Sequence, residues 1–303
     1  MLLSNPLVYP LLPPLGLTLG GLFAGSLLAV LISVRGSWQR LSTSVLFTRW
    51  RTWLVVAPVY SLVVLGGPLP VALFAAALAT QGAREYARLA DLAGVDRLML
   101  VAAAVLVPLA CLLVPSHLLV LGGVLLPLAA SLPALLVGDV QRGLTRLSRL
   151  VFGVWYLPFL LGLLPLLDRD PRGGPGLLLA VGLAVALSDV GAFTFGRLFG
   201  RRTLAPRLSP SKTWAGLLGN VLGAALGIAL LAQHVPGSVP LPGLVGLTAV
   251  GAIWGDLLES LLKRAAAVKD SGAWLPGFGG LLDRLDSLLI VLPLVYALLE
   301  VTR

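Results

Sequence analysis

The sequence is poor in the charged residues on which water-soluble domains depend. Asp, Glu, Lys and Arg make up 12% of its 303 residues, against about 25% in a typical soluble domain. Hydrophobic residues make up 58% of the chain, and the mean hydropathy is +0.98. A soluble fold of this size could not bury so much apolar surface, so the composition predicts a protein whose main solvent is the lipid bilayer. The same lack of polarity excludes an intrinsically disordered chain.

Cysteine and histidine are almost absent as well. Cys111 is the only cysteine, which excludes an intramolecular disulfide and therefore a secreted scaffold held together by such bonds. His117 and His234 are the only histidines, and neither belongs to a convincing Ser/His/Asp set or zinc-binding spacing. No G-x-x-x-x-G-K-[ST] or G-x-G-x-x-G pattern occurs, so the common soluble nucleotide-binding folds are not indicated.

Several apolar stretches are long enough, or nearly so, to cross a bilayer, which takes about 20 residues of α-helix. We therefore predict an all-α polytopic membrane protein with about nine to ten transmembrane helices. The first stretch lacks the basic segment and cleavage site of a signal peptide, so we interpret it as a retained span. The stretches are 12–34, 53–66, 68–82, 98–114, 118–137, 151–167, 176–195, 213–232, 242–262 and 287–301.

The positive charges predict how these spans are oriented. The net charge is +9, from 22 Lys and Arg against 13 Asp and Glu. Such an excess fits either a nucleic-acid binder or the basic cytoplasmic loops of a membrane protein. With the N-terminus outside, alternating spans place 19 of the 22 basic residues in inner loops. We therefore expect membrane lipids and no nucleic acid as partners, a bacterial-type inner (plasma) membrane, and a site that faces the cytoplasm.

The chain divides into three regions. Residues 1–48 hold an extra N-terminal helix and a basic loop, 49–150 hold the N-terminal and middle helices, and 151–303 hold the C-terminal helices with the candidate site. Three glycines of the third region, Gly219, Gly223 and Gly227, recur every four residues. Small residues at this spacing predict the close approach of a neighbouring helix.

Two acidic pairs lie at the inner ends of the last two spans. Asp256 and Glu259 share one helical face with Ser260 and Lys263, and Asp283 and Asp286 repeat the i, i+3 spacing. Carboxylates near the bilayer are costly and therefore functional candidates. Oxygen ligands of this kind suit Mg²⁺, which is usually held by one or two carboxylates and substrate phosphates. The alternative is a structural salt-bridge network with the neighbouring basic residues, which are Lys263, Arg264 and Arg284.

Asp189 is a further acidic candidate, since it interrupts the apolar run of the seventh span. Its alternative interpretation is a polar side chain that reaches the membrane interface.

The segment from Arg197 to Lys212 carries five cations, and the turn predicted over 209–213 leads into a helix. A helix N-terminus after Ser and Lys can bind a phosphate, although such a loop can also serve only as an anchor on anionic lipids. Carboxylates facing cations at a membrane surface indicate phosphoryl or nucleotidyl transfer.

A longer pattern unites these residues. The stretch from Ser260 to Asp286 reads S-L-L-K-R-A-A-A-V-K-D-S-G-A-W-L-P-G-F-G-G-L-L-D-R-L-D. It closely resembles the signature of phosphatidate cytidylyltransferases (CDP-diacylglycerol synthases), S-x-x-K-R-x4-K-D-x-G-x3-P-G-H-G-G-x-x-D-R-x-D. Ser188 to Gly200, Ser209 to Gly216 and the run Arg84-Glu85-Tyr86 also resemble blocks of that family. The resemblance covers roughly residue 49 to the end and leaves the first span as an extra element.

The resemblance implies a reaction between CTP and phosphatidate that yields CDP-diacylglycerol and diphosphate, with Mg²⁺ as cofactor. It also implies a possible homodimer, and an active site at the cytoplasmic ends of the C-terminal helices. The roles that it implies are, for catalysis, Asp256, Asp283, Lys263 and Lys269; for metal binding, Asp256 and Asp283 with Glu259 and Asp286 assisting; and for substrate binding, Lys212, Ser209, Thr213, Arg264, Asp270, Arg284 and Asp189.

Two departures from the family pattern leave alternatives open. Phe278 stands where the signature has histidine, and Ala215 stands where a glutamate is usual. Ser211 and Phe193 are milder replacements of Lys and Tyr. The alternatives are a CTP-dependent enzyme acting on a different lipid phosphate, a catalytically impaired paralogue, and a transporter, which only the span count and the charges near the membrane suggest.

Overall fold

The computed structural model describes residues 3–33, 44–115, 118–138, 140–268, 270–272 and 279–302. These residues form a bundle of helices with one short β-hairpin. The α-helices are α1 (Leu12–Ser33), α3 (Val45–Leu65), α4 (Pro68–Leu89), α5 (Gly94–Ala110), α6 (Leu119–Val137), α7 (Gly143–Val154), α8 (Leu163–Arg169), α9 (Gly174–Phe199), α10 (Trp214–Leu230), α11 (Leu241–Ala265) and α12 (Leu282–Val301). The short elements are the turns η1 (Pro6–Val8), η3 (Trp155–Phe159, a π-helix) and η4 (Ala232–His234), and the strands β1 (Thr203–Ala205) and β2 (Ser209–Thr213).

The ten apolar stretches all coincide with helices. Nine of them match one α-helix each, and the sixth corresponds to α7, η3 and α8 in succession. Pro158 lies inside η3, where a proline without an N–H interrupts the regular helical hydrogen bonds. The prediction of an all-α membrane protein is confirmed.

Length and apolarity identify some of these helices as membrane spans without further argument. Four described segments meet both criteria: Leu12–Ile32, Gly143–Arg169, Gly174–Phe199 and Leu241–Ala265. Two shorter apolar helices, Leu121–Val137 and Trp214–Leu230, accompany them. Large apolar side chains also lie on the outside of the bundle, such as Leu17 (79% exposed) and Leu136 (85% exposed). So much exposed leucine suits a lipid environment and not water.

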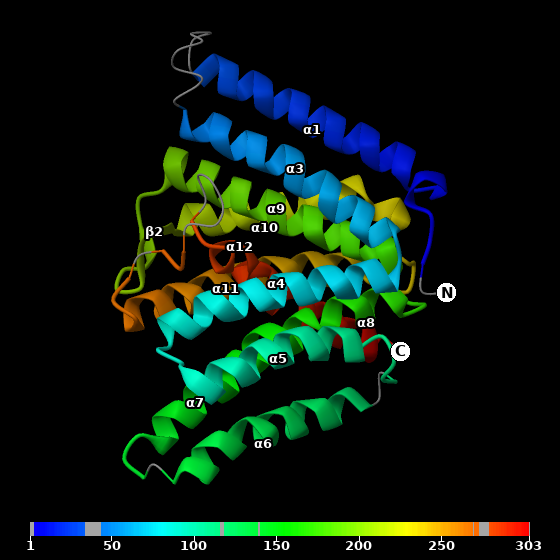
Figure 1. Ribbon diagram of the computed structural model, residues 1–303. Helices are drawn as coiled ribbons and strands as arrows, with labels where there is room; N and C mark the ends of the chain where they lie inside the picture. Colours follow the sequence, from blue (N-terminus) through cyan, green and yellow to red (C-terminus); the bar gives the residue numbers. More distant parts are fainter. Residues whose placement is uncertain are drawn as a thin grey trace.

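The helices lie side by side in a slab, with α1 at one edge and α6 at the other (Figure 1). Both chain termini lie at one end of the helices, whereas β2 lies at the opposite end. The six consecutive residues from Leu163 to Asp168 are buried, which places α8 in the interior of the slab. The hairpin lies at the same end of the bundle as the end of α11 and the start of α12, away from the termini (Figure 1).

The predicted close packing of the glycine-rich helix is confirmed. A Cβ atom built on Gly223 of α10 would lie 2.1 Å from the carbonyl oxygen of Leu187 on α9. A Cβ atom on Gly219 would lie 2.2 Å from the carbonyl oxygen of Gly191. Glycine is thus required because the two backbones touch, as small residues allow in membrane helices.

The hairpin differs from the expected turn. Residues 209–213 form strand β2, because they pair in antiparallel fashion with β1, with Thr203 opposite Thr213. The expected helix start follows directly at Trp214. The hydroxyl of Thr213 accepts a hydrogen bond from the Gly216 amide at 3.0 Å, which is the usual role of a residue that caps a helix N-terminus.

We expect Gly223→Ala to lower the thermal unfolding temperature of the purified protein in detergent, because the new methyl group would overlap the Leu187 carbonyl. Overpacking of this kind costs about 1–3 kcal/mol. Gly246→Ala in α11 is the matched control, since a Cβ atom there meets nothing within 4 Å. Equal unfolding temperatures for the two variants would contradict the close contact between α9 and α10.

Candidate active site

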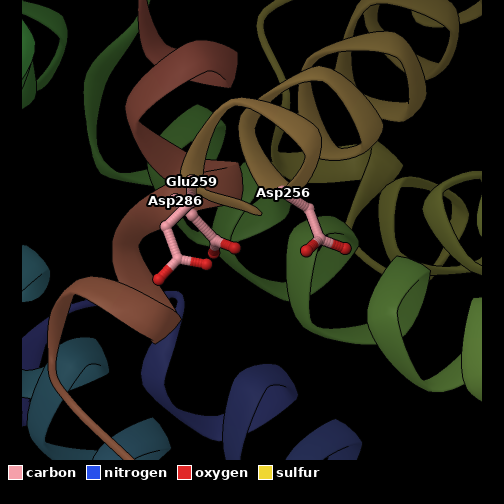
Figure 2. A group of neighbouring side chains, drawn as sticks. All are labelled: Asp256, Glu259 and Asp286. Carbon is pink, nitrogen blue, oxygen red and sulfur yellow. The ribbon is translucent and has the colours of Figure 1, made fainter. Parts of the chain in front are cut away.

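Three carboxylates converge where α11 and α12 come together. Asp256 and Glu259 come from α11 and Asp286 from α12, and each offers an oxygen that lies within 4.8 Å of the others (Figure 2). Gly255 allows this approach, since a Cβ atom there would lie 2.1 Å from the Asp286 carbonyl oxygen. Glu259 and Asp286 are 1% and 6% exposed, whereas the Asp256 side chain is 41% exposed. The three-carboxylate group is therefore open on the side of Asp256.

A single lysine links the two acidic pairs of the sequence. The ammonium group of Lys263 lies 2.5 Å from Oε2 of Glu259 and 2.7 Å from Oδ1 of Asp283. The other oxygen of Glu259, Oε1, is buried and has no hydrogen-bond partner among the described residues. A buried carboxylate oxygen without a partner is costly, and Glu259 also lies beside the carboxylates of Asp256 and Asp286. The donor set, all oxygen and all anionic, fits a hard divalent cation.

Asp283 makes different contacts from Asp286, which lies three residues further along α12. Its Oδ1 receives Lys263, and its Oδ2 accepts hydrogen bonds from the Ser271 amide (3.1 Å), the Ser271 hydroxyl (2.9 Å) and the Gly280 amide (2.8 Å). The sequence grouped Asp283 with the metal ligands, whereas the structure places it outside the three-carboxylate group. Asp283 instead holds the two described ends of the segment that joins α11 to α12.

Glu85 is a site residue that the sequence reasoning did not single out. It lies in α4, is 0% exposed, and accepts hydrogen bonds from the amides of Leu281 (3.1 Å) and Leu282 (2.9 Å). The signal that could have identified it is the run Arg84-Glu85-Tyr86, which resembles a block of the family and holds the one acidic residue of α4. Nothing in the local sequence indicates that its partners lie almost two hundred residues away.

Lys212 brings a positive charge from the hairpin to the carboxylates. Lys212 lies in β2, two residues before α10 begins at Trp214, and its ammonium group forms an ion pair with Asp256. Its side chain is only 18% exposed, and burial, which outweighs the opposing charges of Asp286, Asp189 and Glu259, lowers the pKa of Lys212 to about 8. The hydroxyls of Ser209 and Ser211 lie 3.5 Å apart on the same strand. The hairpin therefore brings a cation to the three-carboxylate group and carries two hydroxyls on the same strand.

The other predicted site residues lie around this centre. Asp189 on α9 lies within electrostatic range of Arg284 and Lys212. Arg264 and Arg284 are exposed at the ends of α11 and α12 that face the site, and Asp270 is exposed between them. Lys269, which the resemblance assigns to catalysis, and Phe278, which stands where the family signature has histidine, lie outside the described residues. His234 lies in η4, beyond the far end of α10.

Comparison with known proteins places the chain in a family. The Cytidylyltransferase family matches residues 47–302. The chain belongs to this family. Among its relatives is a protein of Pseudomonas aeruginosa named phosphatidate cytidylyltransferase, 38% identical over 243 residues, which cover 75% of this chain and 87% of the relative.

Two further relatives carry the same name over shorter matches. One, from Mycobacterium leprae, is 38% identical over 152 residues (50% of this chain, 48% of the relative). The other, from Haemophilus influenzae, is 40% identical over 149 residues (45% of this chain, 51% of the relative). In both cases the chain matches about half the length of the relative.

We expect Lys263→Met to lower the free energy of unfolding by about 3 kcal/mol, because it leaves two buried carboxylates without their shared cation. That value is at the low end for buried pairs because the Lys263 side chain remains 16% exposed. Thermal unfolding in detergent without divalent metal measures the change. Arg264→Met is the control, since it removes the same charge from the adjacent, exposed position. Similar losses in both variants would show that the bridge is not a stabilising contact.

Proposed function

We propose that the chain is a phosphatidate cytidylyltransferase, which converts CTP and phosphatidate to CDP-diacylglycerol and diphosphate. The observation that carries the proposal is the three-carboxylate group beside Lys212, at one end of a membrane bundle, with Asp286 at the end of the signature stretch. The names of the relatives support the same activity. A membrane site of this kind suits one substrate that is dissolved in water and one that is anchored in lipid.

The proposal includes Mg²⁺ as the cofactor. Asp256, Glu259 and Asp286 would hold the ion, with Glu259 Oε1 supplying the oxygen that has no partner among the described residues. Asp283, which the resemblance groups with the metal ligands, accepts hydrogen bonds from Lys263 and from the Gly280 amide, so its proposed part in the metal site is to hold Lys263 and the start of α12. When bound, such a cation neutralises phosphate charge and orients the phosphates of a nucleotide.

The proposed reaction requires no proton transfer by the protein at the attacking phosphate. An oxygen of the phosphatidate phosphate attacks the α-phosphorus of CTP, a new P–O bond forms, and the bond to the β-phosphate breaks as diphosphate leaves. The attacking phosphate is already ionised near neutral pH, since the second pKa of such monoesters is about 6. No general base is needed, so a site without histidine is chemically sufficient.

Within this scheme the basic residues and hydroxyls bind phosphate groups. Lys212 is the best placed, because it already reaches Asp256. Lys263 positions the carboxylates on either side of it. The residues that complete the proposed substrate contacts are Ser209, Thr213, Arg264, Lys269, Asp270, Arg284 and Asp189.

The surroundings of the site are part of the proposal. We place the chain in a bacterial-type inner membrane with the carboxylates facing the cytoplasm, on the distribution of its basic residues. A homodimer is proposed from the family resemblance alone. The gathering of the carboxylates at helix ends favours a surface enzyme over a transporter, whose site belongs near the middle of the membrane.

We expect Asp256→Asn to reduce turnover at least about 100-fold, because it weakens both the proposed cation site and the contact with Lys212. Purified protein receives CTP, phosphatidate and Mg²⁺, and both diphosphate and CDP-lipid are measured. Asp91→Asn is the matched control, because Asp91 is exposed at φ 51°, where asparagine is well tolerated. Excess EDTA is expected to abolish turnover of the unaltered protein.

The same assay separates the proposal from its alternatives. Turnover with a different lipid phosphate but not with phosphatidate would identify another acceptor. A folded protein that binds CTP but turns over no lipid would be a catalytically impaired relative, an outcome that Phe278 and Ala215 motivate. Full activity of Asp256→Asn would remove the three-carboxylate group from the mechanism.

We expect Phe278→His to change turnover by less than about threefold, because a general base, which contributes about 100- to 10,000-fold where one is needed, has no proton to remove here. Initial rates at saturating CTP and phosphatidate measure the effect. A gain of more than about tenfold, which corresponds to about 1.4 kcal/mol of activation free energy, would show that the histidine of the family signature has a catalytic role that this chain lacks.

A further inference from the structure

Glu85 is a fully buried carboxylate in the C-terminal part of α4. Its Oε1 accepts hydrogen bonds from the Gln81 side-chain amide (3.1 Å) and the Leu281 amide (3.1 Å). Its Oε2 accepts from the Leu282 amide (2.9 Å) and lies 3.3 Å from the Ser271 hydroxyl, whose single proton it shares with Asp283. These four donors, which are the ones found among the described residues, are all neutral. The carboxylate is therefore surrounded by backbone and side-chain dipoles. A buried acid is retained at such a cost only with dense hydrogen bonding.

Two of those donors belong to the start of α12. The first amides of a helix have no partner within the helix and carry a partial positive charge. Leu281 occupies the capping position of α12 and has no side chain that could accept them. Glu85 supplies the missing acceptor from α4, 196 and 197 residues away in the sequence. It therefore acts as the N-terminal cap of α12 from a different helix.

Glycines make room for this cap. A Cβ atom on Gly280 would lie 2.7 Å from Oε2 of Glu85, and one on Gly272 would lie 3.2 Å from its Oε1. Ser271 connects the cap to the rest of the site, because its hydroxyl faces both Glu85 and Asp283. Both carboxylates thus bind described residues on the two sides of residues 273–278, with Ser271 before them and Gly280 and Leu281 after them.

We propose that Glu85 is a positioning residue that sets the start of α12 and, through it, the place of Asp286 in the three-carboxylate group. Asp286 lies one helical turn beyond Leu282, so a shift of the first turn carries Asp286 with it. Asp256 and Glu259 belong to α11 and do not follow that shift. The role in turnover rests on the proposed function, whereas the capping contact and its effect on cation binding do not.

Glu85→Gln is the decisive variant, because it keeps the size of the side chain. A carboxamide has one acceptor oxygen and one donor group, so its NH₂ would meet the amide of Leu281 or Leu282. We expect deuterium exchange of the backbone amides in 279–286 to become about tenfold faster, as for the loss of about 1.4 kcal/mol. We also expect Mn²⁺, measured by electron paramagnetic resonance, to bind several-fold more weakly. In turnover assays the Mg²⁺ concentration for half-maximal rate is expected to rise more than kcat falls.

Glu300→Gln is the matched control. Glu300 lies at the other end of α12 and pairs with Arg172, so its substitution removes one charge from the same helix without touching the cap. Exchange in 279–286, Mn²⁺ affinity and the Mg²⁺ requirement are all expected to stay unchanged.

The double variant Gln81→Glu with Glu85→Gln separates geometry from charge. It keeps the composition and net charge of α4 but moves the carboxylate one turn, about 5.4 Å, along the helix. We expect it to behave like Glu85→Gln. Recovery of Mn²⁺ affinity in the double variant would overturn the proposal, since charge and not position would then be what matters.

Two further outcomes decide the case. Unchanged exchange in Glu85→Gln would overturn the capping role, and faster exchange with unchanged Mn²⁺ affinity would overturn the positioning role. If Glu85→Gln does not fold, Glu85→Asp, which keeps the charge and retracts it by one methylene, is expected to show smaller changes in the same direction. If the unaltered protein turns over no CTP, the proposed function fails, while exchange and Mn²⁺ binding still decide the role of Glu85.

Discussion

Lys263 donates to Glu259 on α11 and to Asp283 on α12, and the arrangement of the whole site depends on this shared cation. A buried carboxylate without a partner is far more costly than one that is paired. Among the described residues, the four carboxylates of α11 and α12 lie beside two lysines, Lys263 and Lys212, and within electrostatic range of Arg284. With all of these groups ionised, the centre keeps an excess of negative charge. A divalent cation would remove that excess, and the family to which the chain belongs gives a chemical reason for one.

The two aspartates at the start of α12 have different roles. Asp283 and Asp286 are three residues apart and lie on one side of the helix, yet only Asp286 joins the three-carboxylate group. Asp283 is occupied by Lys263, Ser271 and Gly280. One acid therefore organises the backbone, and the next, one turn deeper, stays available to a ligand.

Features with a local physical cause could be predicted from the sequence. The spans follow from the length of helix that a bilayer demands, and the packing of α10 follows from the glycine spacing. The i, i+3 spacing of Asp256 and Glu259 places them on one face before any tertiary contact is known. The contact between Glu85 and the start of α12 could not be predicted, because no local rule joins positions almost two hundred residues apart. The hydrogen bonds that Asp283 accepts from Ser271 and Gly280 could not be predicted either. They depend on where the backbone lies between α11 and α12, which the i, i+3 spacing does not describe.

The backbone contact between α9 and α10 has a mechanical consequence. With Gly191 against Gly219 and Leu187 against Gly223, no compressible side-chain layer separates the two helices. They form a stiff unit, because a close-packed interface does not deform gradually. Asp189 on α9 and the hairpin that leads into α10 are carried on this unit at a nearly constant separation. Any widening that admits the proposed lipid substrate would therefore occur along the borders of this unit with α3, α8, α11 and α12, and not between α9 and α10.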